Sequence, residues 1–214
     1  MNSGRARVLV LSISVGLLAG CAATSNWVGN DRLKQGDYPG AIEALTRTIE
    51  RDPSNFGAYL SRGVAHERLK EFDKALADYS RAIEIVPRFG RAYHNRGLVY
   101  AKLQKYDRAI ADYDQALAHA NNPVIEAQGS TVGVDAAGVY YDRGNSLYQL
   151  KRYEEAIGSY GEAISRSPRF GAAYNNRGVC HSELGDKKAA CADRTKACEL
   201  GDQVACRWVQ ENCK

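Results

Sequence analysis

The chain of 214 residues repeats one pattern with a period of 34 residues. Glycines that follow an aromatic-x-x-Arg stretch mark this period, because Gly63 and Gly97 lie 34 residues apart, as do Gly144 and Gly178. A tyrosine stands four residues before each glycine, and alanines stand twelve and nineteen residues after it. These residues are Tyr59, Tyr93, Tyr140 and Tyr174, then Ala75, Ala109, Ala156 and Ala190, and finally Ala82, Ala116, Ala163 and Ala197. Self-similarity at such a period indicates stacked supersecondary units rather than one closed core.

The spacing of apolar residues inside each unit predicts helices. In one unit, apolar residues recur at three- and four-residue intervals, which is the stripe of an amphipathic helix. They are Ala75, Leu76, Tyr79, Ala82 and Ile83. Pro53, Pro87 and Pro168 end the second helix of a unit, because the residue before a proline is pushed out of the α region. The sequence shows no alternating strand pattern, so we predict an all-α chain.

The repeated residues resemble the tetratricopeptide repeat, which has a bulky residue at position 4, glycine at 8, alanine at 20, an aromatic at 24, alanine at 27 and proline at 32. On that register, units begin at Phe56, Gly90, Ala137 and Gly171, and a degenerate first unit is readable backwards from Pro53. The resemblance implies a right-handed α-solenoid of about five helix–turn–helix repeats with a C-terminal capping helix. The expected divisions are repeats one to three at 27–123, an inserted loop at 124–136, repeats four and five at 137–202, and the capping helix at 203–214.

Three features depart from the regular repeat. The fifth unit has Arg194 at position 24, where the pattern calls for an aromatic residue. Residues 121–136 interrupt the period with glycine and turn formers, and an insertion of this kind is either a binding loop or a mobile one. After the last unit, Val204, Trp208 and Val209 fall on one helical face, which predicts a helix that covers the open end of the solenoid.

The N-terminus has the pattern of an export signal. Arg5 and Arg7 precede an apolar run, residues 8–18, that is short for a membrane span. The run ends in Leu-Ala-Gly before Cys21, which resembles the bacterial lipobox and implies a signal peptide at 1–20, lipidation of Cys21 and a short linker at 21–26. Ala22 after the cysteine favours the outer membrane, with the protein facing the periplasm. The alternative is an ordinary signal with a chance cysteine.

Five cysteines crowd into the last part of the chain, and none lies between residues 22 and 179. In an exported protein, disulfides are the default for such cysteines. Cys180 and Cys191 occupy facing positions of the fifth repeat, so a bridge between them is expected if their Cα atoms are about 5.5 Å apart. The stretch around Cys198 and Cys206 resembles the Sel1-like cysteine-rich repeats, which implies a bridge across that corner and leaves Cys213 over. A zinc site that combines these cysteines with His181 is the alternative, although no Cys-x-x-Cys pair is present.

Arginine recurs at position 7, where the family usually has leucine, and aspartate recurs at position 23. The arginines are Arg62, Arg96, Arg143 and Arg177, and the residues at position 23 are Asp78, Asp112, Ser159 and Asp193. The pattern predicts an ion pair between the two helices of a repeat, with repeat four as the exception. The alternative is an arginine ladder that binds an anionic ligand such as a carboxylate-ended peptide or a glycan.

Several classes of function find no support in the sequence. The net charge is +4, and basic residues are interleaved with acidic ones, so no nucleic-acid-binding stripe is present. The chain has no His-Glu-x-x-His motif, phosphate loop or dinucleotide fingerprint. We therefore expect no enzyme activity, no cofactor, no metal and no nucleic-acid partner.

The resemblance implies a binding function. In tetratricopeptide repeats, positions 2, 5, 9 and 12 of the first helices line a concave groove. The expected groove residues are Arg91, His94, Tyr141, Asn145, Tyr148 and Asn175. Tyrosine and asparagine supply rigid contact area and adaptable hydrogen bonds, as binding surfaces do. Chaperone-binding relatives hold the C-terminal carboxylate of a peptide with cationic residues and two asparagines. This sequence lacks that combination.

We therefore expect a lipid-anchored periplasmic scaffold that binds a peptide or helix of another envelope protein in this groove. The alternative is an accessory subunit of an envelope enzyme or polysaccharide-export system that contacts glycan.

Overall fold

A computed structural model describes residues 27–120, 124–125 and 131–213 of the chain. The predicted signal peptide and the lipidation site at Cys21 lie outside the described residues. Within the described ranges, no helix has both the length and the hydropathy needed to cross a membrane.

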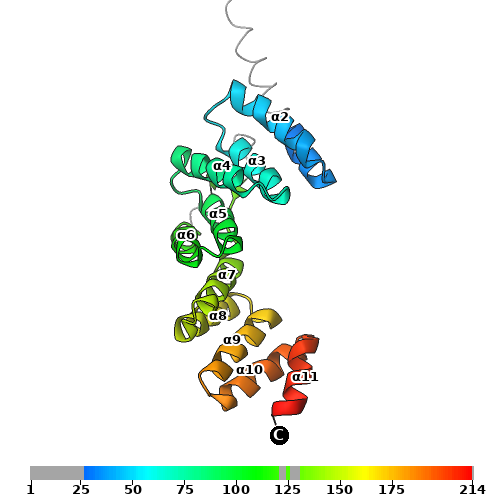
Figure 1. The fold of residues 1–214 in the computed structure, drawn as a ribbon, viewed down its shortest axis with the longest axis vertical. Coiled ribbons are helices and arrows are strands. Elements are labelled where there is room, and N and C mark those ends of the chain that lie inside the picture. The colour runs from blue at the N-terminus through cyan, green and yellow to red at the C-terminus, as the bar shows by residue number, and fades with distance from the viewer. Residues whose placement is uncertain (1–26, 121–123, 126–130, 214) are drawn as a thin grey trace, which may run out of the picture.

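The described chain is a stack of antiparallel helix pairs (Figure 1). Residues 27–35 are helical and pair with α2, Tyr38–Arg51. The following pairs are α3 (Phe56–Arg68) with α4 (Phe72–Ile85), α5 (Gly90–Lys102) with α6 (Tyr106–Ala118), α7 (Ala136–Gln149) with α8 (Tyr153–Arg166), and α9 (Gly171–Glu183) with α10 (Lys187–Glu199). The last helix, α11, is Gln203–Asn212.

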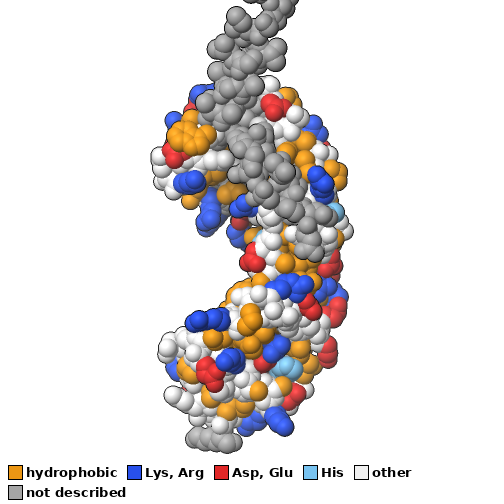
Figure 2. Space-filling model, turned by 180° about the vertical axis from the view of Figure 1, so that it is seen from behind, with side chains coloured by type: hydrophobic (Ala, Val, Ile, Leu, Met, Phe, Trp, Pro, Cys, Tyr) orange, Lys and Arg blue, Asp and Glu red, His pale blue; other side chains and the backbone are white. Residues whose placement is uncertain are grey.

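Each helix packs mainly against its neighbours in the sequence, and the first helices of adjacent pairs also touch one another. The molecule is therefore elongated, and its outline is hollowed on one side (Figure 2). This arrangement confirms the predicted all-α solenoid of about five repeats. One element that the sequence did not predict is a short antiparallel ladder in the insertion, formed by β1 (Val124–Ile125) and β2 (Thr131–Val132).

The ends of the helices follow from local backbone preferences. Asp52, Val86 and Ser167 each precede a proline and adopt extended dihedrals at the C-terminus of the second helix of a pair. Within each of the five pairs, the turn places one residue in the left-handed region. That residue is Gly36, Lys70, Gln104, Lys151 or Gly185. The sequence thus ends its helices at the positions that the repeat register predicts.

A helical glycine and a tyrosine set the distance between the two helices of a pair. A Cβ atom at Gly63 would lie 2.6 Å from Cε1 of Tyr79, and one at Gly144 would lie 2.6 Å from Cε1 of Tyr160. Both tyrosine rings are almost completely buried. Only glycine allows the ring to lie against the helix backbone, so this contact fixes the packing of the pair.

Replacing Gly144 with alanine should destabilise the protein by about 1–3 kcal/mol, because the buried ring of Tyr160 has no space into which to move. Gly158 is the matched control, since it lies on the exposed side of α8 and an added Cβ meets no atom within 4 Å. Gly158→Ala should stabilise the helix by about 0.5–1 kcal/mol. Urea unfolding measures both changes, and equal effects of the two substitutions would contradict the packing role of Gly144.

The arginines at position 7 form the predicted ion pairs. Arg96 on α5 donates two hydrogen bonds to the carboxylate of Asp112 on α6, at 2.8 and 2.7 Å. Arg62 pairs with Asp78, and Arg177 with Asp193, in the same bidentate geometry. The hydrogen bonds to the aspartates raise the pKa of all three arginines above the ordinary value. These guanidinium groups already donate their hydrogen bonds to aspartates, so the structure does not favour a row of arginines that binds an anionic ligand.

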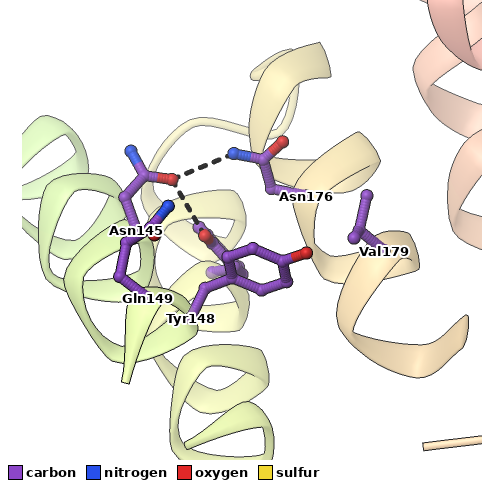
Figure 3. Close-up of a pocket in the computed structure, with 6 residues that line it drawn as sticks. Asn145, Tyr148, Gln149, Asn176 and Val179 are labelled. Atoms are coloured by element: carbon purple, nitrogen blue, oxygen red, sulfur yellow. Dashed lines mark hydrogen bonds between the residues drawn. The ribbon is translucent and has the colours of Figure 1, made fainter. Parts of the chain in front are cut away.

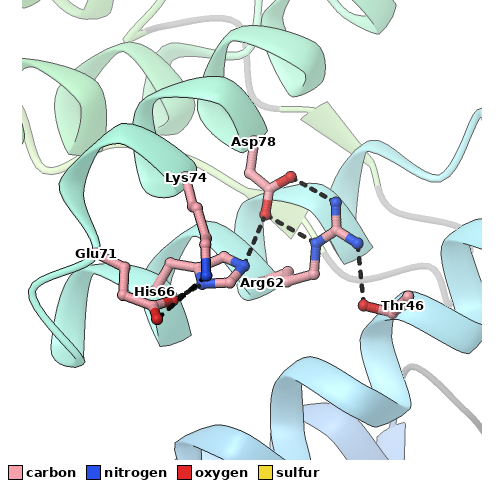
Figure 4. A network of polar contacts seen from close by, with 6 residues as sticks. All are labelled: Thr46, Arg62, His66, Glu71, Lys74 and Asp78. Carbon is pink, nitrogen blue, oxygen red and sulfur yellow. Dashed lines mark hydrogen bonds and ion pairs between the residues drawn. The ribbon is translucent and has the colours of Figure 1, made fainter.

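Two of these arginines, Arg62 and Arg96, also join neighbouring repeats. Nη1 of Arg62 donates to Oγ1 of Thr46 on α2, and Nη1 of Arg96 donates to Oγ of Ser80 on α4, each at 3.0 Å. Figure 4 shows Arg62 between Asp78 and Thr46. Each of these arginines therefore connects three helices, two from its own repeat and one from the preceding repeat.

In repeat four, Arg143 has no aspartate at position 23 of its own repeat. Ser159 replaces aspartate there and accepts a hydrogen bond from Arg143 at 2.7 Å. The carboxylate comes instead from Asp114 on α6, which accepts from Nε of Arg143 at 2.7 Å. Asp114 has the repeat position of Thr46 and Ser80, so the negative charge has moved from within repeat four to the preceding repeat.

Arg96→Leu and Asp112→Leu should each destabilise the protein by about 3 kcal/mol or more, because each change leaves a largely buried partner without its counter-ion. The double substitution should cost less than the sum, and a double-mutant cycle of urea unfolding measures the difference. The exposed pair Arg152 and Glu155 is the control and should show a much smaller coupling. Additive losses at Arg96 and Asp112 would contradict the pairing.

The C-terminal cap contains two disulfides. Cys198 is joined to Cys206, as predicted, with Cα atoms 4.7 Å apart. The predicted bridge between Cys180 and Cys191 is wrong, since Cys191 is joined to Cys213 with Cα atoms 5.7 Å apart. Cys180 is a buried free thiol in the core cluster of Ala156 and Tyr160, so it faces repeat four and away from the cap.

The cap helix α11 packs on the last repeat through Ala205 and through Trp208, which was expected on this face. Ala205 is completely buried, and the ring of Trp208 lies 4.0 Å from Cζ of Arg194. Val204, which was expected on the packing face, is 59% exposed. The two disulfides tie α11 to α10 at both ends of the cap.

Non-reducing peptide mapping of oxidised protein should recover the pairs Cys191–Cys213 and Cys198–Cys206. Cys180 should be alkylated only after unfolding, because burial makes it inaccessible and raises the pKa of its thiol to about 11. Reduction should remove about 3 kcal/mol of stabilisation and loosen α11, while the central repeats stay helical. Recovery of a Cys180–Cys191 peptide, or of five free thiols without reductant, would contradict this arrangement.

Candidate binding groove

The first helices of repeats four and five enclose a pocket of about 280 Å³. Its lining residues, which we call the polar pocket, are Asn145, Tyr148, Gln149, Tyr160, Asn176 and Val179. Figure 3 shows residues of α7 on one side and Asn176 and Val179 of α9 on the other, with the ring of Tyr148 between them. None of these side chains is charged. The pocket therefore suits a ligand segment that offers hydrogen bonds and apolar surface.

Hydrogen bonds hold the walls of the polar pocket in place. Oδ1 of Asn145 accepts from the hydroxyl of Tyr160 at 2.8 Å and from Nδ2 of Asn176 at 2.9 Å. Nδ2 of Asn176 also lies 3.2 Å from the hydroxyl of Tyr141. Burial raises the pKa of Tyr160, with smaller contributions from Cys180 and Tyr141, so its hydroxyl stays protonated and remains a donor. Asn145 is thus fixed by residues of two repeats.

This network leaves several polar groups free for a ligand. Nδ2 of Asn145, Oδ1 of Asn176 and the hydroxyl of Tyr148 make no hydrogen bond with any described residue. Gln149 lies exposed at the edge of the pocket. The pocket therefore offers one free donor, one free acceptor and a hydroxyl group that can do either.

Asn175, on α9, has a buried acceptor that is not satisfied. Its Oδ1 has no hydrogen-bond partner among the described residues. Native structures rarely leave such an atom unpaired, so a donor from a ligand or a water would stabilise it. The side chain stands at a position that the repeat register predicted to line the groove.

Towards the N-terminus, the groove is lined by charged and polar side chains that pair with one another. His94 on α5 and Asp142 on α7 are 2.8 Å apart. Glu67 accepts a hydrogen bond from the hydroxyl of Tyr79 at 2.9 Å and pairs with Lys102 at 2.5 Å. This half of the groove is therefore charged but internally neutralised, and the free polar groups concentrate in repeats four and five.

The structure brings only some of the predicted groove residues together. Asn145 and Tyr148 line the polar pocket, and Tyr141 lies beside it with its ring centroid 4.8 Å from that of Phe170. His94 is paired with Asp142, and Arg91 is exposed on α5 away from the pocket. Of the predicted groove residues, the structure therefore places Asn145 and Tyr148 in the polar pocket, and their binding to a ligand stays a prediction.

Sequence reasoning missed Gln149, Tyr160 and Asn176 as lining residues. A signal for Asn176 is present, because position 6 is polar in every unit from the second onward. These residues are Ser61, Asn95, Asp142 and Asn176. In the structure, Asp142 and Asn176 reach back from this position to the first helix of the preceding repeat. Tyr160 reaches the pocket from a second helix, which the register of first helices does not include.

The described residues contain no cluster of three or more histidine, cysteine, aspartate or glutamate side chains that could hold a metal ion. The cysteines proposed as the alternative zinc ligands are engaged in disulfides, apart from the buried Cys180.

Family models described as tetratricopeptide repeat match residues 29–88, 90–123 and 171–200, and one described as TPR repeat matches residues 137–185. A crystal structure of MamA superposes with a TM-score of 0.72 and 22% identity, over 83% of this chain and 96% of that chain. YrrB, described as a TPR protein with an unusual peptide-binding site, superposes with a TM-score of 0.69 and 17% identity, over 86% of this chain and 88% of that chain. At these identities the likeness concerns the fold alone.

Among curated proteins, the human small glutamine-rich tetratricopeptide repeat-containing protein beta is 35% identical over 71 residues. The match covers 33% of this chain and 23% of that protein. Because the family models together match most of residues 29–200, the chain belongs to the tetratricopeptide-repeat family.

Proposed function

We propose that this protein is a scaffold that binds an extended peptide segment of another protein in the polar pocket and the adjoining groove. The observation that carries the proposal is the fixed pair Asn145 and Asn176, which line the pocket and whose remaining amide groups have no partner among the described residues. Such amides can bind successive backbone N–H and C=O groups of a peptide in any sequence context. The ring of Tyr148 adds rigid contact area beside them.

Two further observations support a peptide ligand. The unpaired Oδ1 of Asn175 would be satisfied by a backbone N–H donor. YrrB, which shares the fold, is described as having a peptide-binding site.

We also propose that the protein acts in the cell envelope, anchored by lipid at Cys21 and facing the periplasm from the outer membrane. The lipobox-like Leu-Ala-Gly before Cys21 and the disulfides of the cap support this setting, because disulfides persist in oxidising compartments. The bound segment would then belong to another envelope protein. A glycan, contacted on behalf of an envelope enzyme or export system, is the alternative ligand.

A photo-crosslinking amino acid at Gln149, at the exposed edge of the pocket, should trap the partner in intact envelopes. Tyr148→Ala and Asn145→Ala should each lower the yield about tenfold, since hot-spot truncations commonly cost more than 1 kcal/mol. Gln115 on the exposed side of α6 is the matched control, and a crosslinker there should not trap the same protein. Equal trapping from both positions, or trapping that Tyr148→Ala leaves unchanged, would contradict the groove. Retained polysaccharide without any protein would favour the glycan alternative.

Cys21→Ser should abolish acylation and release the protein from membranes, because several acyl chains on one residue give stable anchoring and no helix among the described residues could span a membrane. Metabolic labelling with a fatty acid and fractionation of envelopes measure both effects. Cys180→Ser is the control and should leave membrane attachment unchanged. A Cys21→Ser protein that still sediments with the outer membrane would refute the lipid anchor.

A further inference from the structure

Arg194 occupies the repeat position at which the three preceding repeats have Tyr79, Tyr113 and Tyr160. In those repeats the buried ring lies under the helical glycine, and two of the hydroxyls bond to groove residues of the first helices, Glu67 and Asn145. Arg194 follows the same course, because a Cβ at Gly178 would lie 2.8 Å from its Cγ. The last repeat therefore places a guanidinium group where the others place a phenol.

Arg194 is largely buried and forms no salt bridge with any described residue. Arg194 is 9% exposed, and its Nε is buried without a hydrogen-bond partner among the described residues. The neighbouring Asp193 is already bound in bidentate fashion by Arg177. Burial lowers the pKa of Arg194, although an arginine keeps its charge in proteins. A buried cation without a paired carboxylate is unfavourable in the unbound state.

One face of the guanidinium lies on Trp208 of α11, with Cζ 4.0 Å from the ring centroid. This stacking holds the group in one orientation. Asp202, at the N-terminus of α11, attracts the guanidinium from a distance, but its Oδ1 accepts the backbone N–H groups of Val204 and Ala205. The cap therefore fixes the orientation of the Arg194 guanidinium but gives its Nε no acceptor among the described residues.

Arg194 is the counterpart, in the fifth repeat, of Tyr160, which lines the polar pocket, so the repeat geometry directs its guanidinium towards the next part of the groove. Gly178, which covers the stem of Arg194, directly precedes Val179 in the pocket wall. The ring of Tyr148 extends towards Val179 in Figure 3, and Tyr148 is one of the groups that counteract the lowering of the Arg194 pKa by burial. A peptide that continues from the uncharged pocket in this direction would thus meet one fixed positive charge.

We propose that Arg194 binds a carboxylate of the peptide in the groove, either an Asp or Glu side chain or the C-terminal carboxylate. The proposal rests on the proposed function and adds a ligand class to it. A carboxylate would satisfy the unused donors of a planar guanidinium in bidentate geometry and neutralise the buried charge. This subsite is not part of the set of first-helix positions that line the groove. Its cation comes from the second helix of the last repeat and is oriented by the cap.

The probe is a pool of random dodecapeptides in three forms, applied to the purified full-length oxidised protein. The first form has a free C-terminal carboxylate, the second is amidated, and the third is amidated and lacks Asp and Glu. The wild-type protein should retain peptides with a carboxylate about tenfold more than the third form, since one charge-assisted hydrogen bond contributes that much. Preference for the first form over the second identifies the terminus, and equal retention of the two identifies acidic side chains.

Arg194→Tyr should abolish this preference while the remaining retention through Asn145 and Tyr148 persists. Tyrosine is the residue of the preceding repeats at this position, so the fold should tolerate it, and an unchanged disulfide map verifies that it does. Arg194→Lys keeps the charge without the planar fork and should retain only part of the preference. Arg207→Tyr, on the exposed side of α11, is the matched control and should leave the preference unchanged.

The outcomes separate the two proposals. Wild-type retention without any preference for a carboxylate, or a preference that survives in Arg194→Tyr, overturns the role of Arg194 and leaves the peptide groove standing. No retention of any of the three forms overturns both proposals.

Discussion

The fit of one tyrosine ring against one helical glycine fixes the geometry on which the rest of this solenoid depends. Because the ring of Tyr79 lies against Gly63, the two helices of the repeat approach closely enough for Arg62 to reach Asp78. The same ring directs its hydroxyl towards the concave face, where it bonds to Glu67. One packing contact therefore positions both the ion pair that stabilises a repeat and a polar group of the groove.

The regular spacing explains how much of the fold could be predicted from the sequence. Residues 16 positions apart across one turn meet in every repeat, so the pairing of Arg96 with Asp112 followed from the pattern alone. Contacts between repeats were not predicted, because they depend on how the pairs stack. The carboxylate that Asp114 supplies to Arg143 is such a contact, and the bridge from Cys191 to Cys213 depends in the same way on where α11 lies.

The candidate site shows the same division. Asn145 and Tyr148 were predicted, because the groove register of the first helices is a property of one repeat. Asn176 and Tyr160 were missed, since they reach the pocket from the next repeat and from a second helix. Arg194 was recognised as a departure from the pattern, but its burial without a salt bridge to any described residue is visible only when α11 is in place.

The central claim is that the paired arginines hold the solenoid together, whereas Asn145, Tyr148 and Asn176 of the polar pocket bind the partner. A substitution scan that measures protein abundance and crosslinking from Gln149 in the same cells tests this most directly. The account predicts that changes at Arg62, Arg96 and Gly144 lower abundance and crosslinking in proportion, whereas changes at Tyr148 lower crosslinking at constant abundance. Arginine substitutions that abolish crosslinking without lowering abundance would contradict the claim and assign the ligand to the arginine ladder.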